Sequence, residues 1–179
     1  EKMDGEIATL YPDGYYHPRS LTHSPHWSRD IVHALIPGIL PAMRVNEIFV
    51  FENMYARHTI EYNDLGDYLY LLYVVRQGRV VGFKETQKIA DRNGLVMPSI
   101  IFSGRLVSTK QLKTLTGYRE GYVIRPSETF EYYDIATRTA KYVVTDFIQN
   151  GEEHWTTQEP TKNRLRCSES NPPRKTRMA

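Results

Sequence analysis

The sequence predicts a mainly β, β-rich α+β fold, an antiparallel barrel or sandwich of about seven strands with an N-terminal helix and one or two short helices. Short runs rich in β-branched and aromatic residues recur along the chain, and turn-forming residues separate them. Strands and helices do not alternate regularly, which argues against a parallel sheet. The 179 residues, 40% hydrophobic and 25% charged, suit one globular domain with appendages.

Residues 1–24 are rich in Tyr, Pro, Gly and Asp, and this composition predicts an irregular arm. A helix over residues 25–36 should follow, because Ser24 can cap it and Pro25 loses no hydrogen bond at the first helical position. Pro37 should end this helix, since proline disfavours the helical conformation of the residue before it.

Two β-rich runs follow, "VNEIFVFEN" (45–53) and "YARHTIEY" (55–62). The clearest hairpin is "DYLYLLYVVRQGRVVGFKE" (67–85), where Gly78 can adopt the positive φ of a tight turn. Its first arm is apolar on both faces, which predicts a central strand.

The second half of the chain alternates short helical and extended patterns. We expect helices at 86–92, ending at Asn93-Gly94, and at 108–117. We expect strands at 99–104, 121–126, 129–134 and 140–147, with the last two joined as a hairpin. The domain should span 25–157, followed by a C-terminal tail over 158–179.

The net charge of +2 hides a basic tail, since residues 161–179 carry six basic side chains and one acidic one. Such a tail attracts nucleic acid or an acidic protein. The only cysteine, Cys167, has no partner for an intrachain disulfide, which favours an intracellular location. No apolar run is long enough to span a membrane.

The histidines offer one candidate catalytic cluster. A helix over 25–36 would place His26, Asp30 and His33 on one polar stripe, and His26 with Asp30 could act in acid–base chemistry or as metal ligands. A polar stripe is also the ordinary exposed face of an amphipathic helix, and we assign no metal site. His58 would point inward from its strand, as an acid–base group or as a hydrogen-bonded core residue.

Aromatic and basic residues are interleaved elsewhere, a pattern with which sheets bind single-stranded nucleic acid by stacking and charge neutralisation. The predicted binding residues are Tyr55, Arg57, Tyr118, Arg119, Tyr122 and Arg125, with Arg164, Arg166, Arg174 and Lys175 of the tail.

Two functions remain open. Phosphate-binding glycine motifs and the nucleophile elbow are absent from the sequence, which favours a non-enzymatic interaction domain. Its partner would be a macromolecule, either single-stranded nucleic acid or an acidic protein. The alternative is a β-barrel that binds a small molecule, or an enzyme that uses His58 or the His26/Asp30 pair. The sequence identifies no cofactor.

Overall fold

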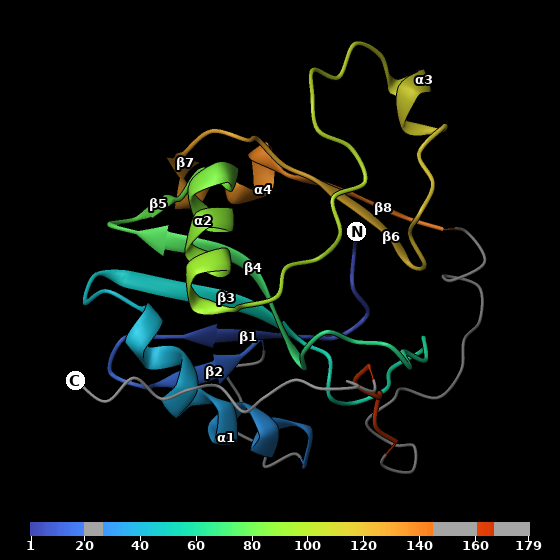
Figure 1. Ribbon diagram of the computed structural model, residues 1–179. Coiled ribbons are helices and arrows are strands. Elements are labelled where there is room, and N and C mark those ends of the chain that lie inside the picture. The colour runs from blue at the N-terminus through green and yellow to red at the C-terminus, as the bar shows by residue number, and fades with distance from the viewer. Residues whose placement is uncertain (20–26, 145–160, 167–179) are drawn as a thin grey trace.

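The computed structural model describes residues 1–19, 27–144 and 161–166 (Figure 1). Eight strands in these residues form a six-stranded sheet, in the order β2-β1-β3-β4-β5-β7, and a two-stranded sheet of β6 and β8. Every pairing between these strands is antiparallel. The β-rich α+β prediction is therefore confirmed, but neither sheet closes into a barrel.

The large sheet contains β1 (Glu6–Leu10), β2 (Tyr16–Pro18), β3 (Glu47–Asn53), β4 (Leu69–Arg76), β5 (Arg79–Val80) and β7 (Phe130–Glu131). Strands β1 and β2 lie where we expected an irregular arm. The predicted hairpin is confirmed as β4 and β5, and Gln77 and Gly78 adopt positive φ angles of 51° and 75° at its turn. As predicted, β4 is an internal strand, between β3 and β5.

The small sheet pairs β6 (Gly121–Ile124) with β8 (Ala140–Val143). The predicted hairpin between 129–134 and 140–147 is therefore wrong. Buried Phe130 pairs instead with Val80 of the large sheet. The second half of the predicted strand 129–134 is the 3-10 helix η3 (Tyr132–Asp134), and the predicted hairpin loop after it contains α4 (Ile135–Arg138).

The N-terminal helix begins with η1 (Trp27–Arg29), continues as α1 (Asp30–Ile39) and ends in η2 (Leu40–Ala42). The prediction that Pro37 ends it is wrong. The N–H of Leu40 still bonds to the carbonyl of Ile36, and burial of Ile39 in the core favours the extra turn. No helix in the described ranges combines the length and apolar character of a membrane span.

Helix α2 (Phe83–Asn93) ends as expected, with Gly94 in the left-handed conformation. The helix predicted at 108–117 is reduced to α3 (Thr109–Leu112). The segments 55–62 and 99–104, both predicted as strands, are irregular instead. In the segment 55–62, the side chains of Asp4 and Asn163 accept hydrogen bonds from backbone N–H groups.

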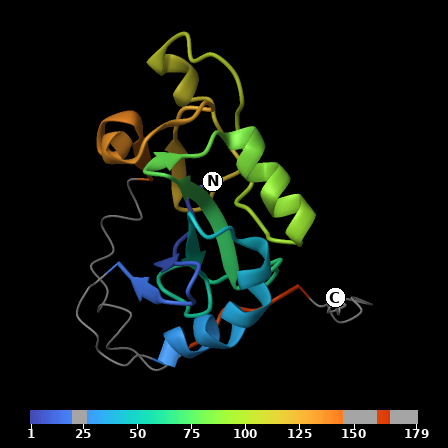
Figure 2. The same ribbon diagram turned by 90° about the vertical axis from the view of Figure 1, so that its left-hand side faces the viewer.

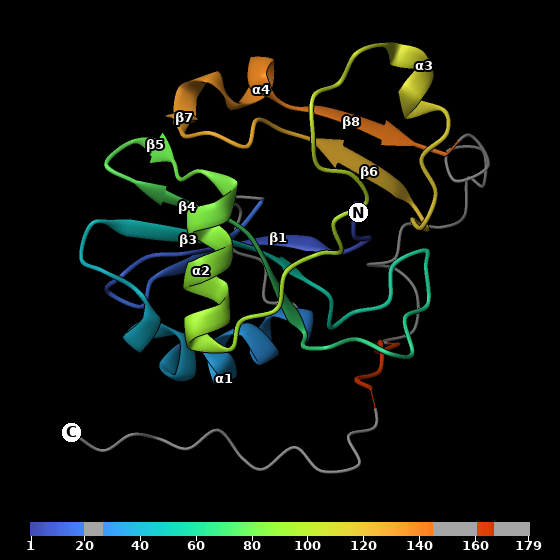
Figure 3. The same cartoon turned by 45° about the horizontal axis from the view of Figure 1, so that its top comes forward.

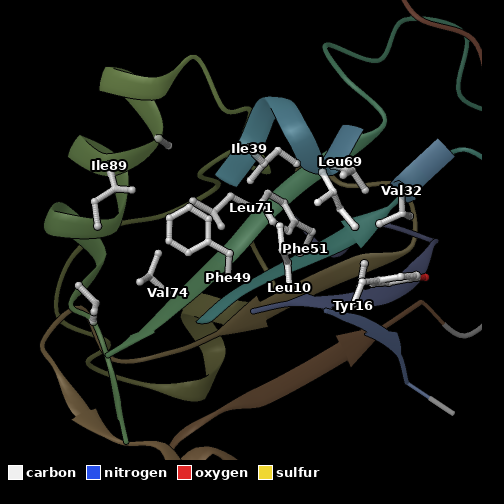
Figure 4. Close-up of a cluster of buried hydrophobic side chains, with 14 residues drawn as sticks. Leu10, Tyr16, Val32, Ile39, Phe49, Phe51, Leu69, Leu71, Val74 and Ile89 are labelled. Carbon is white, nitrogen blue, oxygen red and sulfur yellow. The ribbon is translucent and has the colours of Figure 1, made fainter. Parts of the chain in front are cut away.

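The main core lies between one face of the large sheet and the helices α1 and α2 (Figures 2 and 4). Leu10, Phe49, Phe51 and Leu71 project from β1, β3 and β4 onto this face. Because side chains alternate along a strand, Glu52 and its β1 partner Ile7 lie on the opposite face. Arg125, which follows β6 of the small sheet, contacts Tyr73 and the carbonyl of Leu72 in β4.

Candidate active site

The segment before β1 meets the start of β6 at the junction of the two sheets, where Figure 3 shows the N-terminus. The backbone N–H of Lys2 donates to the carbonyl of Gly121 at 2.9 Å. This contact places the Lys2 ammonium against Glu120, and the two side chains form an ion pair through Nζ and Oε1. The Lys2 side chain is 24% exposed, so it is not fully enclosed by the protein.

Glu120 is the more enclosed partner, with a side chain only 6% exposed. Burial raises its pKa above the ordinary value, and its hydrogen bond with Lys2 counteracts part of that rise. Its second oxygen, Oε2, is buried without a hydrogen-bond partner in the described residues. A buried carboxylate oxygen without a hydrogen bond is costly, and this cost favours the protonated form of the carboxyl group.

Glu52 approaches the same ion pair from β3. Burial raises its pKa to about 7, while the positive charge of Lys2 and a hydrogen bond from the Gly5 N–H (3.2 Å) act in the opposite direction. The negative charge of Glu120 contributes to the rise. Glu52 therefore exchanges its proton close to neutral pH, as a general base should.

Asp4 fixes the backbone beside Lys2. Its carboxylate oxygen Oδ2 accepts hydrogen bonds from the N–H groups of Thr59 (2.9 Å) and Ile60 (2.8 Å). Its own N–H donates to the hydroxyl of Tyr62 at 3.3 Å. Asp4 thus acts as an anchor that attaches the Lys2 segment to the loop after β3.

Two glycines permit these close approaches. A Cβ at Gly5 would lie 2.5 Å from the carbonyl oxygen of Asn53, at the end of β3. A Cβ at Gly121 would lie 1.9 Å from the carbonyl oxygen of Tyr142, in β8. Larger residues would push β3 and β8 away from the site.

An amine between carboxylates of raised pKa can act as a nucleophile once a carboxylate takes its proton. Lys141 in β8 adds a second positive charge that acts on Glu120. Lys2 and Lys141 are the cations that act on this group of carboxylates, and cations of this kind can contact a phosphate. In the described ranges, no group of three or more His, Cys, Asp or Glu residues could hold a metal ion.

Of the predicted catalytic residues, the structure describes His58 and Asp30, and neither contacts the Lys2–Glu120 ion pair. His58 is on the loop rather than on a strand, so the expected alternation is wrong, and its Nδ1 lies 4.0 Å from Asp4 Oδ1. Asp30 is exposed at the start of α1, which packs on the face opposite to Glu52. His26 is outside the described residues.

Two of the predicted aromatic residues, Tyr118 before β6 and Tyr122 within it, lie together, with their ring centroids 5.3 Å apart. Arg119 lies over the ring of Tyr62 at 4.8 Å and pairs with Asp64 at 3.3 Å.

Arg125 follows β6 and is half-buried. Its guanidinium lies over the rings of Tyr73 (5.7 Å) and Phe83 (5.3 Å) and donates to the carbonyl of Leu72. Tyr55, Arg57, Arg164 and Arg166 gather around the loop after β3. Arg174 and Lys175 are outside the described residues.

Sequence reasoning missed the residues that form this junction, namely Lys2, Asp4, Glu52, Glu120 and Lys141. Two local signals could have found part of the set. Glu52 directly follows the apolar run Ile48–Phe51 of β3, and the Lys-Met-Asp-Gly sequence at 2–5 places two opposite charges and a glycine just before β1.

A scan against protein-family models matched residues 1–143 to a model described as RNA ligase. No curated protein and no solved structure matched the chain significantly. The family match contradicts the prediction of a non-enzymatic interaction domain, because a ligase is an enzyme. It agrees with nucleic acid as the partner. Since the match covers 143 of the 179 residues, the chain belongs to the RNA ligase family.

Proposed function

We propose that the chain joins RNA ends and that Lys2 Nζ is the nucleophile that first accepts a nucleotidyl group. The observation that carries the proposal is the Lys2–Glu120 ion pair, which lies beside Glu52 at the junction of the two sheets. The family match supplies the substrate class, and this geometry supports the mechanism.

Joining a phosphate end to a hydroxyl end requires an activated phosphate, because a phosphate monoester is a poor electrophile. In the first step the Lys2 amine attacks the α-phosphorus of a nucleoside triphosphate. A nitrogen–phosphorus bond forms, the bond to the β-phosphate oxygen breaks and pyrophosphate leaves.

Two further steps complete the reaction. An oxygen of the RNA 5′-phosphate attacks the nucleotidyl phosphorus and the bond to the Lys2 nitrogen breaks. The nitrogen takes up a proton as it leaves, and the RNA end is now activated. The 3′-hydroxyl of the other RNA end then attacks the RNA 5′-phosphate, and the nucleoside monophosphate leaves. The acceptor hydroxyl loses its proton in this last step.

The first step needs an uncharged amine, so Lys2 must transfer a proton. Glu120 is in direct contact with Nζ, and its pKa is raised by burial. Glu52, with a pKa of about 7, can accept the proton in the neutral range. Asp4 holds the backbone beside Lys2, so that the nitrogen keeps a fixed position relative to both carboxylates.

The test uses each of the four nucleoside triphosphates labelled with ³²P at the α-phosphate, with Mg²⁺ as their counterion. We expect one or more of them to label the protein covalently, through a bond that resists alkali and breaks in acid, as a phosphoramidate does. Lys2→Arg should abolish labelling, because a guanidinium keeps the charge but is not a nucleophile at this pH. The control Lys88→Arg changes an exposed lysine of α2 and should label normally.

A second assay follows the substrate. Wild-type protein should convert RNA with a ³²P-labelled 5′-phosphate into a longer product whose label resists phosphatase, and Lys2→Arg should not. Equal labelling of wild type and Lys2→Arg would contradict the assignment of the nucleophile.

A further inference from the structure

Residues 161–166 lie beyond the part of the chain that the family model matches, and yet they pack against its loop 54–66 (Figures 1 and 3). Their backbone bonds to the loop at several points. The N–H of Arg57 donates to the carbonyl of Thr161 (2.8 Å), and the N–H of Arg164 donates to the carbonyl of Tyr62 (2.8 Å). The segment therefore has a fixed register on the loop.

Asn163 is the anchor of this segment and is only 1% exposed. Its Nδ2 donates to the carbonyls of Met54 (2.8 Å) and Ala56 (3.1 Å), and its Oδ1 accepts from the N–H of Tyr62 (2.9 Å). A buried amide with all these bonds made fixes both the segment and the loop.

Three basic residues occupy alternate positions of this segment, on either side of Asn163. They are Lys162, Arg164 and Arg166, and all three are exposed. In the ranges that the structure describes, none of the three forms an ion pair with a carboxylate. The ammonium of Lys162 lies 4.9 Å from the ring centroid of Tyr55, and the ring of Tyr68 contacts Tyr55 edge-on at 4.9 Å. Lys162 thus lies over an aromatic ring that Tyr68 and Trp27 also contact.

The same loop leads to the candidate active site. It supplies Thr59 and Ile60, whose N–H groups hold Asp4, and Tyr62, over which Arg119 lies. Arg119 directly precedes Glu120. A strand bound along the segment would therefore continue toward the junction of the two sheets.

We propose that Lys162, Arg164, Arg166 and Tyr55 form a docking strip for the single-stranded RNA end that is to be joined. This proposal rests on the proposed ligase function and adds the place where its substrate binds. Exposed cations neutralise the phosphates, and a neighbouring tyrosine ring offers a stacking surface for a base of any sequence. An acidic protein would use the cations but would leave the ring without a role.

The test measures binding of a fluorescent, 5′-phosphorylated single-stranded RNA by anisotropy at several salt concentrations. The strip variant combines Lys162→Gln, Arg164→Gln and Arg166→Gln. The matched control combines Lys84→Gln, Lys88→Gln and Arg92→Gln, which remove the same charge from exposed positions of α2.

We expect the strip variant to bind RNA at least about tenfold more weakly at about 50 mM salt. Its plot of log K against log salt should be shallower by about 2, since each phosphate contact to a single strand contributes about 0.7. The control should stay within about twofold of wild type. Arg164→Gln alone should reduce the slope by about 0.7, and it replaces the triple variant if urea unfolding shows that the triple variant is not folded.

The proposal is overturned if the strip variant keeps the affinity and salt slope of wild type, or if the control loses both equally. Fluorescent polyglutamate serves as a probe for an acidic protein partner. The proposal is also overturned if the strip variant binds RNA like wild type but no longer binds polyglutamate. Covalent labelling of wild-type protein by a nucleoside triphosphate tests the ligase function separately, since that step uses no RNA.

Discussion

Replacing Glu52 by glutamine should stabilise the protein increasingly as the pH rises. The pKa of Glu52 rises from 4.5 to about 7 on folding, so the folded state binds more protons between these values. The free energy of unfolding therefore falls with increasing pH over this range. Each tenfold change in proton affinity corresponds to about 1.4 kcal/mol, so the loss between pH 5 and pH 8 is about 2.5 kcal/mol.

Glutamine keeps the shape of the side chain and can still accept the hydrogen bond from Gly5, but it cannot ionise. Urea unfolding at pH 5, 6, 7 and 8 gives the difference in free energy between variant and wild type, in which the titrations of other groups largely cancel. This difference should grow by about 2.5 kcal/mol in favour of the variant. Glu61→Gln, at an exposed position paired with Arg57, is the control and should show little change.

The reasoning is refuted if the difference in free energy of unfolding between Glu52→Gln and wild type does not depend on pH, or if the variant becomes less stable than wild type as the pH rises. Either result would mean that Glu52 ionises without cost in the folded protein. Glu52 would then not be a proton acceptor adjusted to neutral pH.

Other consequences follow from the same geometry. The rate of covalent labelling by a nucleoside triphosphate should increase with pH through about 7, as Glu52 loses its proton, and a rapid-quench pH profile of Glu52→Gln should lack this inflection. Asn163→Ala should lower the free energy of unfolding by about 2–4 kcal/mol in urea titrations, because it leaves buried backbone groups unsatisfied, whereas Ala at exposed Asn63 should have little effect. Gly121→Ala should abolish labelling, because its Cβ would clash with the carbonyl of Tyr142 and displace β6; wild-type activity in this variant would contradict the close approach of the two strands.

Local sequence signals explain which elements could be predicted. The turn at Gly78 and the helix end at Gly94 depend on the conformational freedom of single glycines, and both predictions were confirmed. The segments 55–62 and 99–104 have β-forming composition, but neither is a strand in the structure. Asp4 and Asn163, far away in the sequence, bind the backbone of the first segment instead.

The candidate site was hidden for a related reason. Lys2, Glu52 and Glu120 are ordinary charged residues in the sequence, separated by about fifty residues or more. Only the pairing of β1 with β3 and the contact between Lys2 and Gly121 bring them together. The composition therefore indicated binding of nucleic acid. The proposed role of Lys2 depends on contacts between distant residues, which only the fold creates.

Tandem mass spectrometry of the protein after reaction with a nucleoside triphosphate tests the role of Lys2 most directly. We predict a nucleoside monophosphate adduct on the Nζ of Lys2 and its loss when labelled protein is incubated with 5′-phosphorylated RNA. An adduct on His58 or on another side chain, with Lys2 unmodified, would contradict the mechanism.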